Sequence, residues 1–141
     1  TLIEEGFVRR MSGPSLSRAD IADLASWIGA LDAPPRPRVD AAAVARGRAL
    51  FESPEVGCDV CHFGPTGTTR ESLDVGTGAA FQPAVLVGVA YRAPYMHDGC
   101  APTLRDVVAG DPACNGGDAH VRTSHLSSSE VDDLVAFLRT R

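Results

Sequence analysis

The pentapeptide CDVCH, residues 58–62, decides how the rest of the chain is interpreted. Two thiols three residues apart can add to the two vinyl groups of a haem, and a histidine directly after them can bind the iron through its imidazole. The motif therefore predicts one covalent haem c, attached at Cys58 and Cys61, with His62 as the proximal iron ligand.

Three other interpretations of this motif remain open. A structural zinc site needs four ligands, commonly from a second C-x-x-C pair, whereas the remaining cysteines, Cys100 and Cys114, are 14 positions apart. A thioredoxin-like dithiol expects alternating strands and helices, which the pattern lacks, and chance is the third interpretation. Haem is favoured because residues 53–100 are rich in glycine and proline, and so long an irregular stretch needs a group that organises it.

The composition is that of a folded globular chain. Of 141 residues, 44% are hydrophobic and 22% charged. The net charge of −5 excludes a nucleic-acid partner, which would need a basic stripe. No apolar run approaches the roughly 18 residues of a membrane span. The start, TLIEEGFVRR, is not a signal peptide, so we expect a processed N-terminus or a longer parent chain.

Helical spacing of apolar residues predicts three helices, over 17–30, 40–52 and 127–139. Each range begins with a side chain that can cap the first turn of its helix: Ser17, Asp40, and Ser127 together with Glu130 in a capping box. Three prolines within residues 31–40 predict a stiff linker after the first helix.

Two longer segments resemble a known family. ARGRALFESPEVGCDVCHFGP, residues 45–65, resembles the opening of class I c-type cytochrome domains. FQPAVLVGVAYRAPYMHDG, residues 81–99, followed by Thr-Leu and the last helix, resembles the C-terminal haem domain of the bacterial di-haem cytochrome c peroxidase and MauG-like family. The resemblance covers roughly residues 41–139. It implies an all-α, class I cytochrome c-like fold, with helices and long loops wrapped around one covalent haem.

The same resemblance implies how the terminal helices of the domain meet. Gly47 and Phe51 on the first would cross Leu134 and Phe137 on the last, with the glycine permitting close backbone approach. The chain departs from the family in one respect, because the peroxidases use two haems and only one C-x-x-C-H is present here. A second haem would therefore lie outside this chain.

A weak internal repeat suggests where that second haem would be. LSRADIADLASWI, residues 16–28, aligns without gaps on LSSSEVDDLVAFL, residues 126–138. Any two capped amphipathic helices look alike, so the match can be trivial. The alternative is that both helices close the same kind of module. On that interpretation residues 1–31 end a preceding module, 32–40 are a linker, and 41–141 form the cytochrome c domain. Met11 is then either an iron ligand of the preceding module or a core residue.

The sixth iron ligand has four candidates: Met96, His97, His120 and His125. His120 is favoured because it lies six residues before Leu126, where the family's domain carries its distal ligand, usually methionine. Met96 is the alternative, since Pro-x-Met resembles the ligand loop of simple class I cytochromes. His125 lies almost at the cap of the last helix, which indicates a surface residue.

Other residues receive weaker assignments. A carbonyl near Pro65 is expected to accept the proximal imidazole N–H. Arg92 is either a partner for a haem propionate or a solvated surface residue. His97 lies either at the haem edge, as the resemblance implies, or in a surface Asp-Gly turn. Cys100 and Cys114 are predicted to form a disulfide, with two buried thiols as the alternative.

These observations predict electron transfer through a six-coordinate c-type haem. The alternatives are the electron-accepting domain of a di-haem peroxidase-like enzyme and an interaction module with a structural haem. The chain is not expected to be an enzyme on its own. Its partner would be a redox protein or a second haem domain. Covalent haem is attached on the exported side of the membrane, so a periplasmic or otherwise extracytoplasmic location is expected.

Covalent attachment is directly testable. Thioether bonds at Cys58 and Cys61 should keep the haem on the protein through acid-acetone extraction and denaturing electrophoresis, checked by haem staining of the gel. The double variant Cys58→Ser, Cys61→Ser should release its haem under the same treatment. Free haem released from the unaltered protein would refute the attachment.

Overall fold

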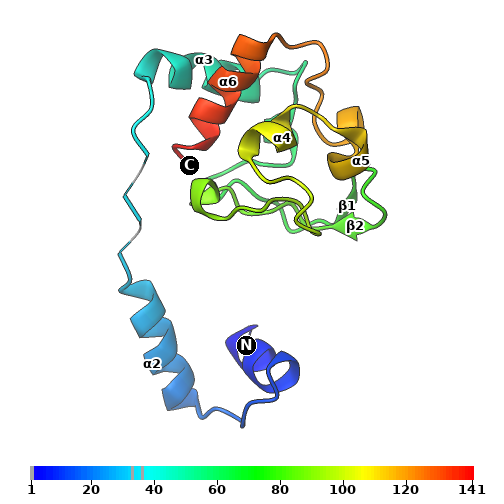
Figure 1. The fold of residues 1–141 in the computed structure, drawn as a ribbon. Helices are drawn as coiled ribbons and strands as arrows, with labels where there is room; N and C mark the ends of the chain where they lie inside the picture. The colour runs from blue at the N-terminus through cyan, green and yellow to red at the C-terminus, as the bar shows by residue number, and fades with distance from the viewer. Residues whose placement is uncertain (1, 33, 36) are drawn as a thin grey trace. The chain divides into compact units, whose positions relative to one another are not determined.

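The computed structural model describes residues 2–32, 34–35 and 37–141 of the chain (Figure 1). Clustering of backbone contacts divides it into two compact units, residues 1–34 and 35–141. Within the described residues, no helix is both long and apolar enough to cross a lipid bilayer.

The first unit consists of two short helical segments. Helix α1 (Leu2–Glu4) continues into the π-helix η1 (Glu5–Arg10), and α2 (Arg18–Gly29) follows after a turn. Ser17 and Asp20 cap α2 reciprocally, which confirms the predicted helix and its cap. No side chain described in this unit is buried, and Trp27 and Leu31 are 62% and 56% exposed. The apolar stripe of α2 is therefore only partly covered, with Ile21 and Leu24 half-buried.

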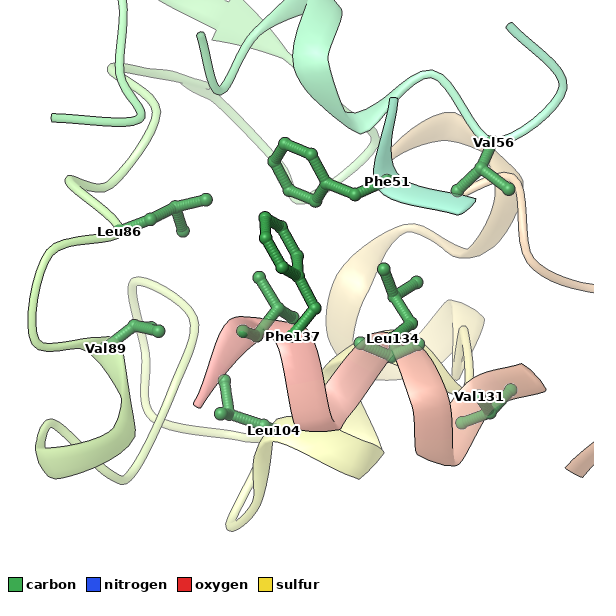
Figure 2. Packing of buried hydrophobic residues seen from close by; sticks show 10 residues of the cluster. Phe51, Val56, Leu86, Val89, Leu104, Val131, Leu134 and Phe137 are labelled. Carbon is green, nitrogen blue, oxygen red and sulfur yellow. The ribbon is translucent and has the colours of Figure 1, made fainter. Parts of the chain in front are cut away.

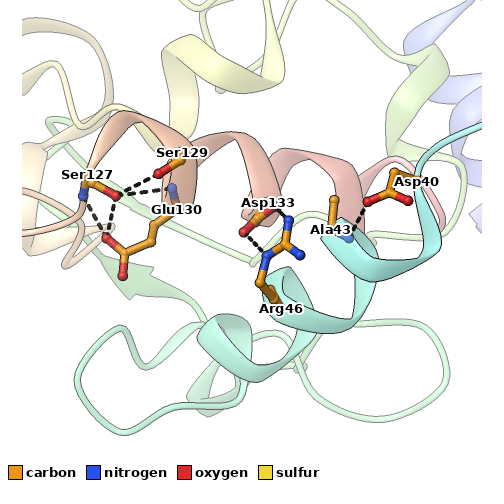
Figure 3. A network of polar contacts seen from close by, with 7 residues as sticks. All are labelled: Asp40, Ala43, Arg46, Ser127, Ser129, Glu130 and Asp133. Carbon is orange, nitrogen blue, oxygen red and sulfur yellow. Dashed lines mark hydrogen bonds and ion pairs between the residues drawn. The ribbon is translucent and has the colours of Figure 1, made fainter.

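The second unit is built on the pair α3 (Ala41–Phe51) and α6 (Ser128–Leu138). Both helices and caps are as predicted: Asp40 accepts from the Ala43 N–H, and Ser127 and Glu130 form the capping box (Figure 3). A Cβ on Gly47 would lie 1.9 Å from the Asp133 carbonyl oxygen, so the two backbones are in direct contact there. This confirms the predicted crossing.

Side chains on either side of the crossing complete the contact between α3 and α6. The Phe51 and Phe137 rings pack at 5.1 Å between centroids with a 57° tilt, a favourable aromatic geometry (Figure 2). On the other side the Arg46 guanidinium donates two hydrogen bonds, of 2.6 and 2.7 Å, to the Asp133 carboxylate (Figure 3). That contact lowers the pKa of Asp133 and raises the pKa of Arg46.

The chain between α3 and α6 has little regular structure, as predicted for residues 53–100, and the two short α-helices that follow were not predicted. Its elements are η2 (Cys58–Val60), β1 (Leu73–Asp74), β2 (Ala80–Phe81), η3 (Val89–Tyr91), α4 (Leu104–Val108), α5 (Pro112–Asn115) and η4 (Gly117–Ala119). The two short strands pair antiparallel, with Leu73 opposite Phe81. The core joins these loops to the helix pair through Phe51, Val56, Leu86, Val89, Leu104, Val108, Val131, Leu134, Phe137 and Leu138.

A disulfide joins Cys100 to Cys114, with 5.5 Å between their Cα atoms. It links the turn at residues 95–101 to α5. Closing a loop of this length stabilises a fold by roughly 3 kcal/mol in the chain-entropy model.

The contact between α3 and α6 predicts a specific sensitivity. Gly47→Ala should lower the free energy of unfolding by about 1–3 kcal/mol, because the added methyl forces two backbones apart. Gly29→Ala is the matched control, since a Cβ at Gly29 in α2 meets nothing within 4 Å. Urea unfolding followed by circular dichroism measures both. Equal midpoints for the two variants would contradict the close contact.

Candidate haem site

A cavity of about 510 Å³ lies in the second unit, between the helix pair and the loops. This volume is within the roughly 300–1,000 Å³ typical of pockets for small ligands and cofactors. Its lining is mostly apolar and includes the residues singled out from the sequence: Cys58, Cys61, His62, Met96, His97 and His120. The fold therefore brings the motif together with three of the four proposed sixth ligands. His125 is exposed and does not line the cavity.

The CDVCH motif forms a single tight turn. Gly57 starts it in a left-handed conformation, with φ of 69°, and the N–H groups of Cys61 and His62 both donate to the Cys58 carbonyl, at 3.3 and 2.9 Å. This turn brings Cys58, Cys61 and His62 to the lining of the cavity. A porphyrin with two vinyl groups and a central iron needs that arrangement from its attachment site.

Both motif cysteines are free thiols in this structure. Burial, with smaller contributions from the neighbouring Asp59 and Cys61, raises the pKa of Cys58 to about 11. Reactive dithiols and thiolate metal ligands have the opposite property, a lowered pKa. The environment of Cys58 therefore favours an apolar cofactor over a redox dithiol.

The His62 ring has a defined tautomer. Its Nδ1 lies 2.9 Å from the Gly67 carbonyl oxygen. A carbonyl only accepts hydrogen bonds, so Nδ1 carries the proton, and in that tautomer Nε2 keeps the lone pair that can bind iron. The Ala84 carbonyl also interacts with the ring. Burial lowers the pKa of His62, which also favours the neutral, ligating form. The expected carbonyl near Pro65 thus belongs to Gly67, two residues further along the chain.

Gly67 is a residue that sequence reasoning missed. It is buried, has φ of 64°, and a Cβ there would lie 2.9 Å from the Leu86 Cβ. A side chain would therefore clash with Leu86 and strain the backbone whose carbonyl holds His62. The glycine-rich run after the motif was the available signal, but it does not say which carbonyl faces the imidazole.

His120 directly follows η4 and lies in the same cavity. Its Nδ1 is buried, and no described residue forms a hydrogen bond with it. Burial lowers the pKa of His120, and the neighbouring His62 lowers it further, so the two imidazoles are electrostatic neighbours. An unpartnered buried nitrogen is costly, and this environment fits a second axial ligand.

Met96 is also brought to the cavity, so the structure does not separate the two leading candidates by position alone. Its φ is 68°, unusual for a side-chain-bearing residue. A tight turn holds it there: the Tyr95 N–H donates to the Ala101 carbonyl at 2.8 Å, and the Gly99 N–H to the Met96 carbonyl at 3.3 Å. A methionine held this way can pack against a porphyrin or bind its iron through the thioether sulfur.

Three further side chains lie at the cavity. The His97 ring is exposed and stacks on Phe81 at 4.1 Å between centroids. Arg92 donates to the Val85 carbonyl while it lines the cavity. Arg122, which sequence reasoning did not single out, also lines it and lies beside Gly57. Two guanidinium groups at one apolar cavity are suited to the carboxylates of a haem.

Metal binding by protein side chains alone has no counterpart among the described residues. They contain no group of three or more histidine, cysteine, aspartate or glutamate side chains that could hold an ion. A haem iron takes only two ligands from protein, since the porphyrin supplies four nitrogens. The two thiols and two imidazoles that line the cavity fit a haem.

Comparison with known proteins agrees with this site. No protein-family profile matches the chain. A hydrazine synthase gamma subunit from Kuenenia stuttgartiensis is 28% identical over an alignment of 141 residues, covering 67% of this chain and 39% of that subunit. A cytochrome-c peroxidase from Pseudomonas sp. (strain SCT) is 39% identical over 77 residues, covering 55% of this chain and 20% of the peroxidase. The chain thus spans well under half of either relative.

A solved structure shows the same fold. Hydrazine synthase from Kuenenia stuttgartiensis, pressurised with xenon, contains a chain that superimposes with a TM-score of 0.78 over 99% of this chain and 60% of that one, at 24% identity. The fold is all-α and cytochrome c-like. The likeness to this structure concerns the fold, and the two sequence relatives are a hydrazine synthase subunit and a cytochrome-c peroxidase.

The contact between Gly67 and His62 yields a prediction. Gly67→Ala should shift its carbonyl away from Nδ1 and raise the reduction potential of the haem-loaded protein, because a weaker hydrogen bond makes the imidazole less basic. The expected size is about 1 kcal/mol in redox free energy, the net value of one hydrogen bond.

The control for this prediction is Gly64→Ala. Gly64 also has a positive φ, of 71°, but a Cβ there meets nothing within 4 Å. Both variants carry left-handed strain, and only Gly67→Ala should move the potential in a spectroelectrochemical titration. Equal shifts in both would show that the Gly67 carbonyl has no specific role.

Proposed function

We propose that residues 41–141 form a cytochrome c domain that transfers single electrons through one covalent haem. Cys58 and Cys61 attach the haem, His62 is the proximal ligand and His120 the distal ligand. The observation that carries this proposal is the pair of neutral imidazoles in one apolar cavity. His62 has its Nδ1 bound to a carbonyl, and His120 has a buried nitrogen with no partner among the described residues.

The side chains around the cavity have separate roles in this proposal. Gly67 orients the proximal imidazole, while Leu86, Leu104 and Leu134 exclude water from the cavity. Haem supplies a one-electron couple when bound. With an imidazole on each face of the iron, no position is left for a substrate, so this domain on its own passes electrons and catalyses no reaction.

The alternative is that the domain accepts electrons within a di-haem peroxidase-like enzyme whose other haem lies outside this chain. Two observations favour it. The chain covers only a fifth of a cytochrome-c peroxidase to which it is similar. The α2 helix also shares the capping box of α6, yet its Trp27 and Ile28 are exposed, whereas α3 covers the apolar side chains of α6.

On this alternative, residues 1–31 are the closing helix of a preceding module and 32–40 the linker. Met11, which is 73% exposed, would then face groups outside this chain. The two proposals differ in the haem content of the natural polypeptide, one haem against two. In either case the partner is a redox protein or a second haem domain, and the location is periplasmic or otherwise extracytoplasmic.

The distal ligand is tested by spectra of the ferric protein. The unaltered protein should be low-spin, lack the far-red band of a thioether–iron bond and not react with peroxide. His120→Ala should turn high-spin and gain a coordination site. Met96→Leu is the matched control, because it removes the other candidate ligand, the Met96 thioether, from the same cavity. It should leave the spectrum unchanged.

The opposite pattern would assign the sixth ligand to Met96. A far-red band in the unaltered protein, or an unchanged spectrum in His120→Ala, would be sufficient. The reduction potential gives a second readout, since two imidazoles should hold it below the value that a histidine and a thioether produce.

A further inference from the structure

Asn115 is the most deeply buried polar side chain described in the cytochrome domain. It is 0% exposed and, with Leu134, one of the two largest side chains that are fully buried. It ends α5 and directly precedes a pair of left-handed glycines, Gly116 and Gly117. Burying an amide is unfavourable unless both its ends are hydrogen-bonded, so its partners indicate why it is there.

The Asn115 amide joins two separate segments. Its Oδ1 accepts from the Gly117 N–H at 3.0 Å. Its Nδ2 donates to the Val107 carbonyl and, at 3.5 Å, to the Asp106 carbonyl, both in α4. One side chain therefore ties the start of η4 to the C-terminal half of α4.

Both of these segments border the haem cavity. The Gly117 carbonyl accepts hydrogen bonds from the N–H groups of His120 and Val121, at 3.0 and 2.9 Å. Val107, like its neighbour Val108, lines the cavity wall. Gly117 alone thus connects the Asn115 side chain to the His120 backbone. The other end of the Asn115 amide is hydrogen-bonded to Val107 in the cavity wall.

The rest of the η4 turn is also closely packed. A Cβ on Gly116 would lie 2.0 Å from the Val75 carbonyl oxygen, so the turn rests against the loop after β1. The disulfide from Cys114 ties the preceding residue to the Met96 turn. These contacts restrain the η4 turn together with the Asn115 amide, which connects it to α4.

We propose that Asn115 is a positioning residue that fixes where the His120 imidazole is presented to the haem iron. This inference rests on the proposed function, because it requires His120 to be the distal ligand. Asn115 itself does not reach the iron; it acts through Gly117. Losing it should loosen His120 in the cavity, so that an external ligand competes with the imidazole more easily.

The test is the affinity of the ferric, haem-loaded protein for cyanide, which must displace the internal sixth ligand. Asn115→Leu keeps a similar volume but removes both hydrogen-bonding ends. It should raise the cyanide affinity by about tenfold or more, because losing a residue that orients a metal ligand typically weakens that ligand's function about 10–100-fold. Asn115→Ser serves the same comparison if the leucine variant does not fold.

Two controls separate positioning from general destabilisation. Gly47→Ala, which is expected to lower stability at the contact between α3 and α6, changes a residue that does not line the cavity and should leave the cyanide affinity unchanged. Asn115→Leu combined with His120→Ala should bind cyanide no more tightly than His120→Ala alone, because no ligand remains to be positioned.

Each outcome decides one claim. If His120→Ala leaves the cyanide affinity unchanged, the proposed ligation is wrong. If His120→Ala raises it but Asn115→Leu behaves like Gly47→Ala, the ligation stands and the positioning role is overturned. If Asn115→Leu has the same effect with and without His120, the amide acts elsewhere and the inference fails.

Discussion

At Gly47 the backbones of α3 and α6 are so close that a single methyl group would lie 1.9 Å from the Asp133 carbonyl oxygen. Only glycine allows this approach, and the paired phenyl rings and the Arg46–Asp133 contact depend on it. The arginine is largely solvent-exposed, so that ion pair contributes little by itself. The apolar contact is the main energetic term, and the ion pair fixes the register of the two helices.

This helix pair supports a domain whose loops cannot form a full core. The cavity of about 510 Å³ lies between the helix pair and the loops. The loops around it are held by a few specific hydrogen bonds, such as the Leu86 N–H to the Thr66 carbonyl and the Thr68 hydroxyl to the Pro83 carbonyl. The helix pair and the loops thus enclose a cavity that suits a planar apolar group.

Much of this arrangement follows from local sequence, because local patterns have local causes. The caps at Ser17, Asp40 and Ser127 predicted the helix starts, since an N-cap acts within three residues. The spacing of CDVCH predicted a haem-attachment motif, and only the structure shows the turn that it forms. The helix crossing came from the family resemblance, and only the structure shows its cause, the missing Cβ of Gly47.

What could not be predicted depends on contacts between distant segments. The carbonyl facing His62 belongs to Gly67 because of packing against Leu86, 19 positions away. Met96 and His120 both reach the cavity, and sequence offsets alone cannot rank two side chains that a disulfide-linked loop brings together. Asn115 reads as a turn residue, and its burial appears only once α4 and η4 are placed.

The contact between Arg46 and Asp133 joins residues 87 positions apart, which are the two ends of the domain. A chain that emerges N-terminus first from a ribosome or a translocation channel cannot close this domain until its last helix has appeared, because such long-range contacts form late in folding. During that interval the two thiols of CDVCH are not yet enclosed. The topology therefore gives any machinery that modifies them a period of access, which ends when α6 docks.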